Sequence, residues 1–314
     1  MKKFPITFAI CGLFIFLIIG CGENISYPPE ITIDPPPEIT IDSLFFGTDS
    51  TFEIITWNIE WFPKNGQITV DLVTQIIPII DADVYALQEI ENSNYFATLL
   101  QEINDFDTLN TWQGFRANSA YAYINLAYIY KSNEITLEED IYEIYQDENW
   151  NLPRSPLVME IEWNGTEITI INNHLKAFSD GESEERRRQA CILLENYIVQ
   201  NLPNEKVILL GDLNDSLLDD EDDNVFQVFL DEPGNYKFAD MEIATGSITD
   251  WSYPSWPSHI DHILTTNELF DEINDENSEI QTIKIDEYLD GGWSEYEQSI
   301  SDHRPVGIKL KLGE

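Results

Sequence analysis

Acidic, amide and imidazole side chains recur along this chain at the ends of short apolar segments. Residues 54–57, 84–87, 168–171 and 207–210 have the length and the β-branched, apolar character of buried strands. Strand ends are where a rigid sheet can hold reactive groups against solvent. We therefore expect one divided active site, assembled from Asn58, Glu89, His174, Asp212, Asn214, Asp261, Asp302 and His303.

A hairpin signal places a base beside this set. Asn164-Gly165 predicts a two-residue turn between residues 157–163 and 166–172, and such a turn fixes the register of the two strands. In that register Arg154 comes to lie next to His174 and Lys176. We expect a phosphate-sized cationic pocket there. The alternative is that Arg154 forms a structural ion pair with one of the many acids.

Acidic residues dominate the charge: 58 Asp and Glu against 16 Lys and Arg give a formal net charge of −42. Such a surface repels polyanions, so simple tight binding of DNA is disfavoured. Hydrolysis of a polyanion is not excluded, because salt screens the charge, with a Debye length of about 8 Å at physiological salt and roughly 3 Å near 1 M. We interpret the acidity as an adaptation for solubility, suited to a saline medium.

The N-terminal residues have the features of an export signal. Lys2 and Lys3 precede an apolar stretch from Ile6 to Gly20, which is shorter than the roughly 20 residues that cross a bilayer as a helix. Residues 18–21, Ile-Ile-Gly-Cys, resemble the bacterial lipoprotein cleavage box, which implies that Cys21 is lipidated and anchored to the cell envelope, periplasmic or at the cell surface. An uncleaved anchor and an ordinary signal peptide are the alternatives, and both also export the domain.

A proline-rich segment follows this signal peptide of residues 1–20. Residues 28–34 are repeated without change at 36–42. Because proline fixes φ, we expect residues 21–50 to be an extended tether, with two small edge strands as the alternative. We expect residues 51–314 to form one catalytic domain, because this length suffices for one large core and no second break in composition appears. The hydrophobic content of 43% excludes a disordered chain. We expect the protein to be a monomer.

Six short motifs occur in order: Trp57-Asn58-Ile59-Glu60, Leu87-Gln88-Glu89, Asn173-His174-Leu175, Gly211-Asp212-Leu213-Asn214, Ser258-His259-Ile260-Asp261 and Ser301-Asp302-His303. Together, over residues 52–312, they resemble the endonuclease/exonuclease/phosphatase superfamily, the deoxyribonuclease-I-like enzymes. The resemblance implies an α/β fold, a four-layer α/β sandwich with two packed, mainly antiparallel sheets flanked by helices. It leaves the substrate open, because members cleave DNA, RNA, abasic sites, inositol phosphates and sphingomyelin.

The secondary structure read from the sequence fits that architecture. Strands are expected before Asn58, Glu89, His174, Asp212, Asp261 and Asp302, and helices over residues 69–80 and 184–200. Asp180 or Ser183 is expected to cap the later helix. Cys191 lies in the apolar phase of that helix, so we expect it to be buried rather than catalytic.

The resemblance implies a metal site. Glu89 is expected to be the primary Mg²⁺ ligand, because magnesium prefers one or two carboxylates together with water and substrate oxygens. Asp302 would complete the metal shell, and Asn58 would hold Glu89 or a metal-bound water. Mn²⁺ and Ca²⁺ are the alternative cofactors.

The remaining motif residues are expected to act on a phosphate ester. Asp212 would orient and deprotonate the attacking water, and Asn214 would align the water or a phosphate oxygen. His303 would hydrogen-bond the phosphoryl oxygens, with Asp261 favouring its imidazolium form. His174 resembles the second catalytic histidine of the deoxyribonuclease branch. Residues 121–128 lack the acid that braces this histidine there, which favours a hydrogen-bonding role over general-acid catalysis.

Three residues are candidate contacts to the substrate phosphate: Arg154, Lys176 and Tyr128. For Tyr128, alternation with Leu126 and Tyr130 suits a core position equally well. The tryptophans Trp251, Trp256 and Trp293 either pack loops or form a stacking rim for bases.

Two other metal sites are weaker readings of the sequence. His259, Asp261 and His262 suggest zinc, but in a strand 259 and 261 project to one side and 262 to the other. We therefore interpret His262 as a replacement for the arginine common after this aspartate in the family, and His259 as a residue near the rim. The acidic run 219–223 suggests calcium, but a solvated loop fits its spacing better.

The sequence therefore predicts an exported, metal-dependent hydrolase of phosphate esters. We favour a Mg²⁺-dependent phosphodiesterase that acts on nucleic acid, a nuclease. A phosphatase or lipid phosphodiesterase of the same superfamily is the alternative, although no lipid-docking loop is evident. An inactive binding module is the alternative of another class, and the intact motif set argues against it.

Overall fold

Two β-sheets form the centre of the computed structural model, which describes residues 44–120 and 124–313. The first sheet has the spatial order β12 (Glu279–Thr282), β13 (Val306–Leu310), β1 (Phe52–Phe62), β2 (Val84–Ile90), β4 (Asn125–Lys131) and β3 (Trp112–Arg116). The second has the order β10 (Tyr236–Phe238), β11 (Asp261–Thr266), β9 (Val207–Asp212), β8 (Thr166–His174), β7 (Leu157–Trp163) and β5 (Ile135–Leu137), and β6 (Tyr142–Glu143) also pairs with β7. Among these described strands, β1–β2 and β8–β9 pair in parallel and the other pairs are antiparallel.

The two sheets pack face to face over an apolar core. Phe52 and Ile54 of β1 and Ile208 and Leu210 of β9 belong to one buried cluster between the sheets. Their spacing of two residues follows from the alternation of side chains along a strand. Each large aliphatic side chain removed from water stabilises the fold by about 1.5–3 kcal/mol.

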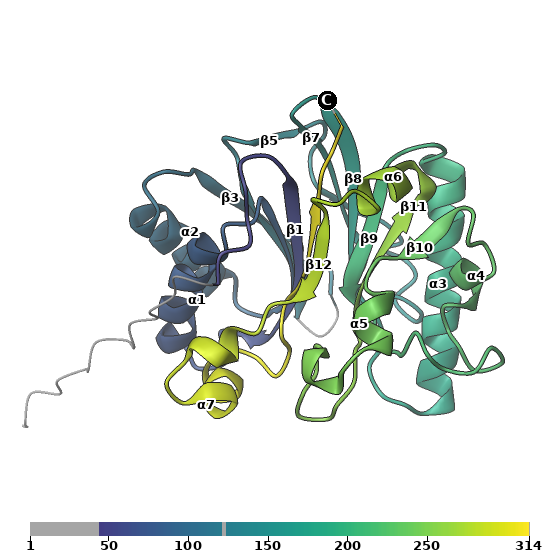
Figure 1. The fold of residues 1–314 in the computed structure, drawn as a ribbon. Helices are drawn as coiled ribbons and strands as arrows, with labels where there is room; N and C mark the ends of the chain where they lie inside the picture. The colour runs from purple at the N-terminus through teal and green to yellow at the C-terminus, as the bar shows by residue number, and fades with distance from the viewer. Residues whose placement is uncertain (1–43, 121–123, 314) are drawn as a thin grey trace, which may run out of the picture. The chain divides into compact units, whose positions relative to one another are not determined.

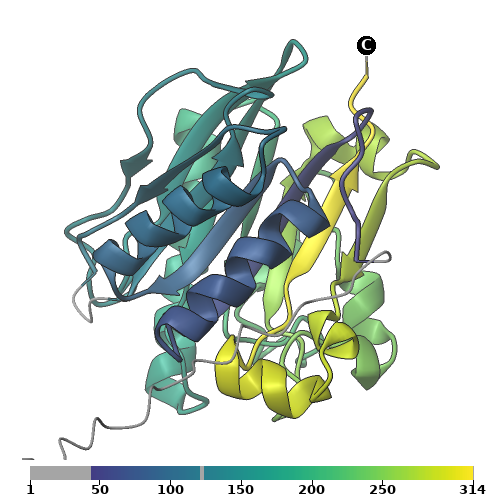
Figure 2. The ribbon, with the colours of Figure 1, turned by 90° about the vertical axis from the view of Figure 1, so that its left-hand side faces the viewer.

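Helices cover the outer faces of both sheets. Figures 1 and 2 show α1 (Gln67–Ile80) and α2 (Ser93–Phe106) against the first sheet, and Figure 1 shows α3 (Gly181–Asn201) on the far side of the second. The predicted four-layer α/β sandwich is therefore confirmed. The shorter helices are α4 (Gln227–Leu230), α5 (Met241–Thr245), α6 (Phe270–Ile273), α7 (Gly292–Ser299), η1 (Ile248–Asp250), η2 (Asn267–Leu269) and η3 (Ile285–Tyr288).

Local sequence explains where the helices begin. The carboxylate of Asp180 accepts a hydrogen bond of 3.1 Å from Ser183 N and caps α3, one of the two caps predicted. Cys191 is buried in α3, as expected. Helix α2 was not predicted, although Asn92 caps it by accepting from the backbone amides of Asn94 and Tyr95.

The folded domain begins earlier than predicted. Leu44 and Phe46, assigned to the tether by sequence, are buried in the core between the first sheet and its helices, and Phe46 N donates to Ile80 O at 2.9 Å. The predicted signal peptide, Cys21 and the tether up to residue 43 lie outside the described residues. Within those that are described, no helix has the length and apolar character needed to span a membrane.

Strand direction brings the candidate residues to one edge. β2, β8 and β9 end at or next to Glu89, His174 and Asp212, as predicted, whereas Asn58 lies inside β1, which continues to Phe62. Asp261 instead begins β11, and Asp302 and His303 precede β13. The strands expected before these residues are thus wrong. Because β11 and β13 are antiparallel to β9 and β1, their starts lie where the other strands end.

Candidate active site

Three candidate residues stand in register across the second sheet. His174 of β8 pairs with Asp212 of β9, and Asp212 pairs with Asp261 of β11. The preceding Gly211 makes this close approach possible: its φ is +144°, and a Cβ there would lie 1.9 Å from Asn173 O. The three side chains are buried together at the sheet edge.

Asp212 is the point at which both sheets meet. Asn58 reaches from the first sheet and donates through Nδ2 to Asp212 Oδ2 at 2.9 Å. His174 Nε2 lies 3.4 Å and His303 Nε2 3.9 Å from the same oxygen. Three of the predicted residues therefore converge on the carboxylate of a fourth.

The environment of Asp212 tunes its affinity for protons. Burial raises the pKa of the carboxyl, His303 and the Asn58 hydrogen bond lower it, and the carboxylates of Asp261 and Glu89 raise it, to about 7. A carboxylate with a pKa near neutrality is well matched to accepting a proton from water.

His303 is held as a charged donor. Its Nδ1 lies 2.8 Å from Asp261 Oδ2, so Nε2 points toward Asp212. Burial alone would lower the pKa of His303, but the carboxylates of Asp261 and Asp212 outweigh burial and raise it to about 10. The ring of Tyr253 packs at 4.8 Å from the imidazole, and Ser301 Oγ accepts from His303 N at 2.9 Å. This surrounding fixes the ring orientation.

Glu89 lies on distorted backbone. Asn58 of β1 pairs with Gln88 of β2, and Phe62 pairs with Ile90. Between these pairs β1 therefore has two more residues than β2 and forms a bulge. Glu60, Trp61 and Glu89 have φ of 32°, 49° and 63°. Bulges and left-handed residues of this kind are strained and concentrate at functional sites, where they aim side chains.

The carboxylate of Glu89 is held by two N–H donors. Trp61 N donates to Oε2 at 3.0 Å, and Asn58 Nδ2 lies 3.4 Å from Oε1. Asn58 Oδ1 turns the other way and accepts from Glu60 N at 3.0 Å. Asn58 therefore holds both Glu89 and Asp212 through its side-chain amide.

Asp302 borders the same bulge from the other side. Its backbone N donates to Glu60 Oε2 at 2.9 Å, and its side chain keeps 25% of its surface exposed. Lys64 pairs with the same Glu60 carboxylate. Burial raises the pKa of Glu60, Lys64 lowers it, and the Asp302 carboxylate raises it further. Carboxylates thus crowd around the β1 bulge.

This donor set fits a hard divalent cation. Glu89 and Asp302 offer oxygen ligands, which Mg²⁺, Mn²⁺ and Ca²⁺ prefer. The repulsion that Glu89 and Asp261 exert on Asp212 would be relieved by bound positive charge. A second close group, Asp212, Asp261 and His303, has ligand atoms within 4.8 Å of one another. Both nitrogens of His303 face carboxylates: Nδ1 is hydrogen-bonded to Asp261, and Nε2 lies on the side of Asp212. We therefore interpret His303 and Asp261 as a hydrogen-bonded pair beside the proton acceptor Asp212, rather than as a metal site.

His174 is a neutral imidazole. Burial, Arg154 and His303 all hold the pKa of His174 well below its usual value. Its Nδ1 is buried and has no hydrogen-bond partner among the described residues. This agrees with the missing bracing acid and with a hydrogen-bonding role rather than that of an acid.

Arg154 faces the catalytic carboxylates. Burial lowers the pKa of its guanidinium, and the carboxylates of Glu89 and Asp212 act in the opposite sense. The hairpin register is confirmed: Trp163 pairs with Thr166, and the ladder ends at Leu157, just after Arg154. The structural ion pair considered as the alternative is not formed with any described residue.

Tyr128 and Lys176 make contacts other than the one predicted with the reacting phosphate. Tyr128 is fully buried between the sheets, and its hydroxyl lies 2.9 Å from Leu157 O and accepts from Asn172 N at 3.0 Å. The strand alternation that gave a core position as the alternative for Tyr128 is the correct reading. The Lys176 ammonium turns outward, donates to Ala177 O at 2.9 Å and lies 4.2 Å from the centre of the Phe178 ring.

Asn214 links the ends of two strands. It follows Asp212 with φ of 57°, donates from its backbone N to Asp212 Oδ1 at 3.1 Å, and donates through Nδ2 to Leu175 O at 3.3 Å. It therefore fixes the orientation of the Asp212 carboxylate.

His259 and His262 meet at a buried acid that the sequence reading missed. His259 Nε2 lies 3.0 Å and His262 Nδ1 2.6 Å from Asp240 Oδ2, with the ring centroids 5.0 Å apart. The alternation of side chains along a strand does not apply to His259, because β11 begins two residues later, at Asp261. The His259 side chain is also buried rather than at the rim of the site. Ser252 N approaches the other nitrogen of His259 at 3.4 Å, and Asp215 O that of His262 at 2.9 Å. Every ring nitrogen of the two histidines takes part in a hydrogen bond, and the ligand atoms of Asp240, His259 and His262 lie within 4.8 Å of one another, a group that could hold a metal ion.

A family model, described as the Endonuclease/Exonuclease/phosphatase family, matches residues 55–303. The chain belongs to this family. Its enzymes are phosphoester hydrolases, and members use divalent metals. No curated protein matches the sequence.

Solved structures show the family fold. TDP2 of D. rerio complexed with single strand DNA product has a TM-score of 0.59 and 14% identity, over 83% of this chain and 99% of that one. The human Nocturnin catalytic domain with bound sulfate has a TM-score of 0.56 and 15% identity, over 83% and 94%. An endonuclease/exonuclease/phosphatase from Bacteroides vulgatus has 0.57 and 15%, over 84% and 99%.

Residues that the motif analysis left without a role also belong to this site. Tyr253 and Glu60 are two that the motif reading gave no role; Tyr253 lies in the loop before β11 and Glu60 in the β1 bulge. The signal available was their nearness in sequence to Asp261 and Asn58. Of the three tryptophans, Trp251 and Trp293 pack against core clusters, while Trp256 is 78% exposed.

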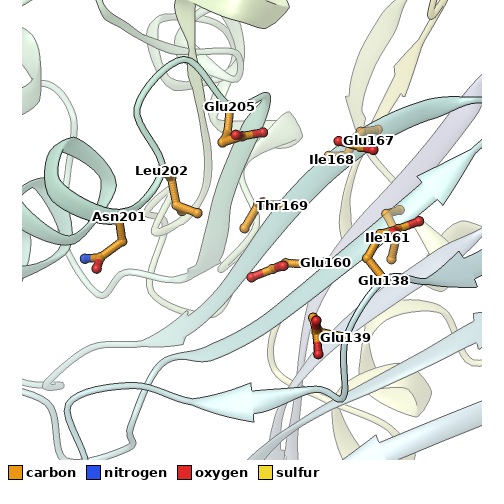
Figure 3. A pocket seen from close by; sticks show the side chains of 10 residues that line it. All are labelled: Glu138, Glu139, Glu160, Ile161, Glu167, Ile168, Thr169, Asn201, Leu202 and Glu205. Carbon is orange, nitrogen blue, oxygen red and sulfur yellow. The ribbon is translucent and has the colours of Figure 1, made fainter.

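A surface pocket away from these residues has the wrong charge for a phosphoester. Figure 3 shows it over β7 and β8, lined by Glu138, Glu139, Glu160, Glu167 and Glu205. No base lines it, so its field repels phosphate. The acidic run 219–223 is an exposed loop.

Proposed function

We propose that this chain is a divalent-metal-dependent phosphodiesterase that hydrolyses nucleic acid. The observation that carries the proposal is the Asp212 carboxylate, buried among Asn58, His174 and His303 at the joined ends of both sheets. Family membership supports the reaction class, and the arrangement supports the roles of the individual residues.

Each side chain then has a physical task. Asp212, held by Asn58 and the Asn214 backbone, takes a proton from the attacking water. His303 donates from Nε2 to a phosphoryl oxygen, and Asp261 keeps it charged. Arg154 neutralises the opposite side of the phosphate, and a cation held by Glu89 and Asp302 would supply Lewis-acid stabilisation of the charge.

The test is a substrate panel. The purified protein is incubated with single-stranded DNA, RNA, bis(p-nitrophenyl) phosphate, p-nitrophenyl phosphate and sphingomyelin, each with Mg²⁺, Mn²⁺, Ca²⁺ or EDTA. Release of acid-soluble nucleotides with metal, and none with EDTA, is expected. Turnover confined to monoesters or to sphingomyelin contradicts the nuclease proposal. No metal-dependent turnover of any phosphoester points to a binding module.

We also propose that the protein is exported, lipid-anchored and monomeric. The support is the sequence: Lys2 and Lys3, the apolar stretch and the box that ends at Cys21. Mass spectrometry of the N-terminal peptide should find a diacylglyceryl group on Cys21, and Cys21→Ser should move the protein from the membrane to the soluble fraction. An unmodified Cys21 peptide from the membrane fraction contradicts the anchor. Sedimentation in detergent reports the oligomeric state.

A further inference from the structure

Bases gather on one flank of the active site. Lys176 precedes α3, and Arg186 lies in its second turn. Burial lowers the pKa of the Lys176 ammonium, and the positive charges of Arg186 and Arg154 lower it further. The carboxylate of Asp180 raises it. Arg187, next to Arg186 in α3, donates to Lys176 O and Phe178 O, so Lys176 and Arg186 lie close together in a chain that has 16 bases against 58 acids. Grouped like charges are unfavourable unless an anion binds among them.

Arg154 extends this group into the catalytic centre. Its Nε is buried and has no hydrogen-bond partner among the described residues. A buried N–H group without a hydrogen-bond acceptor destabilises the fold, and an acceptor on a bound ligand would remove this cost. Because Arg154 also faces Glu89 and Asp212, it connects the outer cations to the position of a reacting phosphate.

Two exposed aromatic rings accompany the outer cations. The Arg186 guanidinium lies 4.3 Å from the centre of the Trp150 ring and donates from Nε to Trp150 O at 2.6 Å. The Lys176 ammonium lies over Phe178. Trp150 and Phe178 are nevertheless 60% and 74% exposed. Large aromatic surfaces left open beside cations are typical of binding surfaces.

The loop that carries Phe178 is held in place. Arg187 donates from Nη1 to Lys176 O and to Phe178 O, both at 2.7 Å, and pairs through Nε with Asp215 at 2.8 Å. Phe178 itself has φ of 82°, a conformation that costs energy for a bulky residue. The ring is thus presented to solvent by a buried arginine.

We propose that Trp150, Lys176, Phe178 and Arg186 form a binding ridge for single-stranded nucleic acid. This inference rests on the proposed function and names its substrate class. Unpaired bases stack on Trp150 and Phe178, the outer cations bind the phosphates between them, and the strand continues to Arg154. A duplex cannot use the ridge in this way, because its bases already stack on one another.

The surroundings favour a strand over a membrane. Arg188, two residues after Arg186 in α3, donates to the backbone oxygens of Asp223 and Asn224, so the acidic run 219–223 lies beside the same helix. An anionic lipid surface would contact this run and be repelled by it. A single strand is narrow enough to follow the cations alone.

Binding without turnover tests the ridge. A fluorescein-labelled short oligothymidylate is titrated with the full protein in EDTA, and anisotropy gives Kd. Because one stacked base accounts for about five- to 150-fold in affinity, the double variant with Trp150→Ala and Phe178→Ala should raise Kd at least about tenfold. Trp150→Phe, which keeps a stacking ring, should recover most of the affinity lost in Trp150→Ala. The matched control is Phe106→Ala, an exposed ring on α2.

Each other outcome overturns the ridge. A change in Kd no larger than that of the control contradicts it, as does an equal effect on a duplex of the same length. Variants that lose binding to phosphatidylglycerol vesicles but not to the oligonucleotide assign the surface to a lipid membrane instead. Circular dichroism confirms folding of each variant. The substrate panel is a separate readout: hydrolysis by the wild type with unaltered strand binding in the variants refutes the ridge while leaving the proposed function intact.

Discussion

Gln88 Nε2 donates a 2.8 Å hydrogen bond to Asn172 Oδ1, and this bond joins the two sheets directly beneath the active site. Both side chains are fully buried. Asn172 Nδ2 donates in turn to Leu87 O and Ala127 O of the first sheet, at 3.1 Å each. Since Glu89 follows Gln88 and His174 lies two residues beyond Asn172, this bridge sets the spacing between the residues of the two sheets.

Replacing Asn172 should therefore reduce both stability and activity. Asn172→Ala removes one acceptor of the Gln88 amide, which keeps Thr56 Oγ1 and Ala86 O, and it removes the side-chain donor to two buried carbonyls; this should lower the free energy of unfolding by about 1–3 kcal/mol. Urea denaturation measures this loss. Asn196→Ala, an exposed asparagine of α3, should change it by less than about 0.5 kcal/mol. Equal losses of unfolding free energy in the two variants would show that the hydrogen bonds of Asn172 do not stabilise the fold.

Gly211 should not tolerate a side chain. In Gly211→Ala the new Cβ would meet backbone atoms of Asn173 at 1.9–2.9 Å, at a φ that L-residues rarely adopt. The pairing of β8 with β9 must open, so the expected loss in unfolding free energy is at least about 3 kcal/mol. Gly234→Ala, which meets open space, is the control. A thermal unfolding midpoint as high in Gly211→Ala as in the control contradicts the argument.

Local patterns predicted the strands that carry most of the site. Apolar segments with reactive residues after them gave β1, β2, β8 and β9, and Asn164-Gly165 gave the register of β7 with β8, because both signals are local. The same reasoning failed for Asp261 and Asp302, since an antiparallel strand brings its first residue, not its last, to the shared edge.

Contacts set by tertiary packing were out of reach. Sequence could not show that Gln88 faces Asn172, because the pairing depends on how two sheets stack. Tyr128 was ambiguous, and only the position of the second sheet assigns its hydroxyl to backbone carbonyls. Lys176 was placed by register near His174, but its ammonium contacts Ala177 O and the Phe178 ring, which the register of the strands does not determine.

Asp212→Asn should abolish most activity and keep the fold. The amide can still accept from Asn58, but it cannot take a proton from water, so kcat should fall by about 10²- to 10⁴-fold. Hydrolysis of bis(p-nitrophenyl) phosphate with Mg²⁺ measures it. Asp105→Asn, an exposed residue of α2, is the matched control. Retention of the full rate in Asp212→Asn would remove this residue from the mechanism.

Two buried acids at the opposite end of the strands should make the fold less stable as pH rises through neutrality. Burial raises the pKa of Glu53 to about 7 and that of Asp83 to about 8, although hydrogen bonds and Lys131 partly oppose it. Glu53 N donates to Asp83 Oδ2 at 2.9 Å, and Glu53 Oε2 is buried without a partner among the described residues. Lys131 pairs with Asp81 at 2.7 Å and lies 3.8 Å from Asp83. The four groups face one another in a largely dry environment.

The sign of the effect follows from proton binding. Between the ordinary values of 4.5 and 3.8 and the raised ones, the folded state holds protons that the unfolded state has lost. The free energy of unfolding therefore falls as pH rises from about 4 to about 8, and changes little from this source beyond that range. Glu53→Gln, which stays neutral, should lose less of its thermal midpoint than the wild type between about pH 5 and about pH 9. Glu91→Gln, at an exposed position, should follow the wild type; if Glu53→Gln does so too, Glu53 is not protonated in the folded protein.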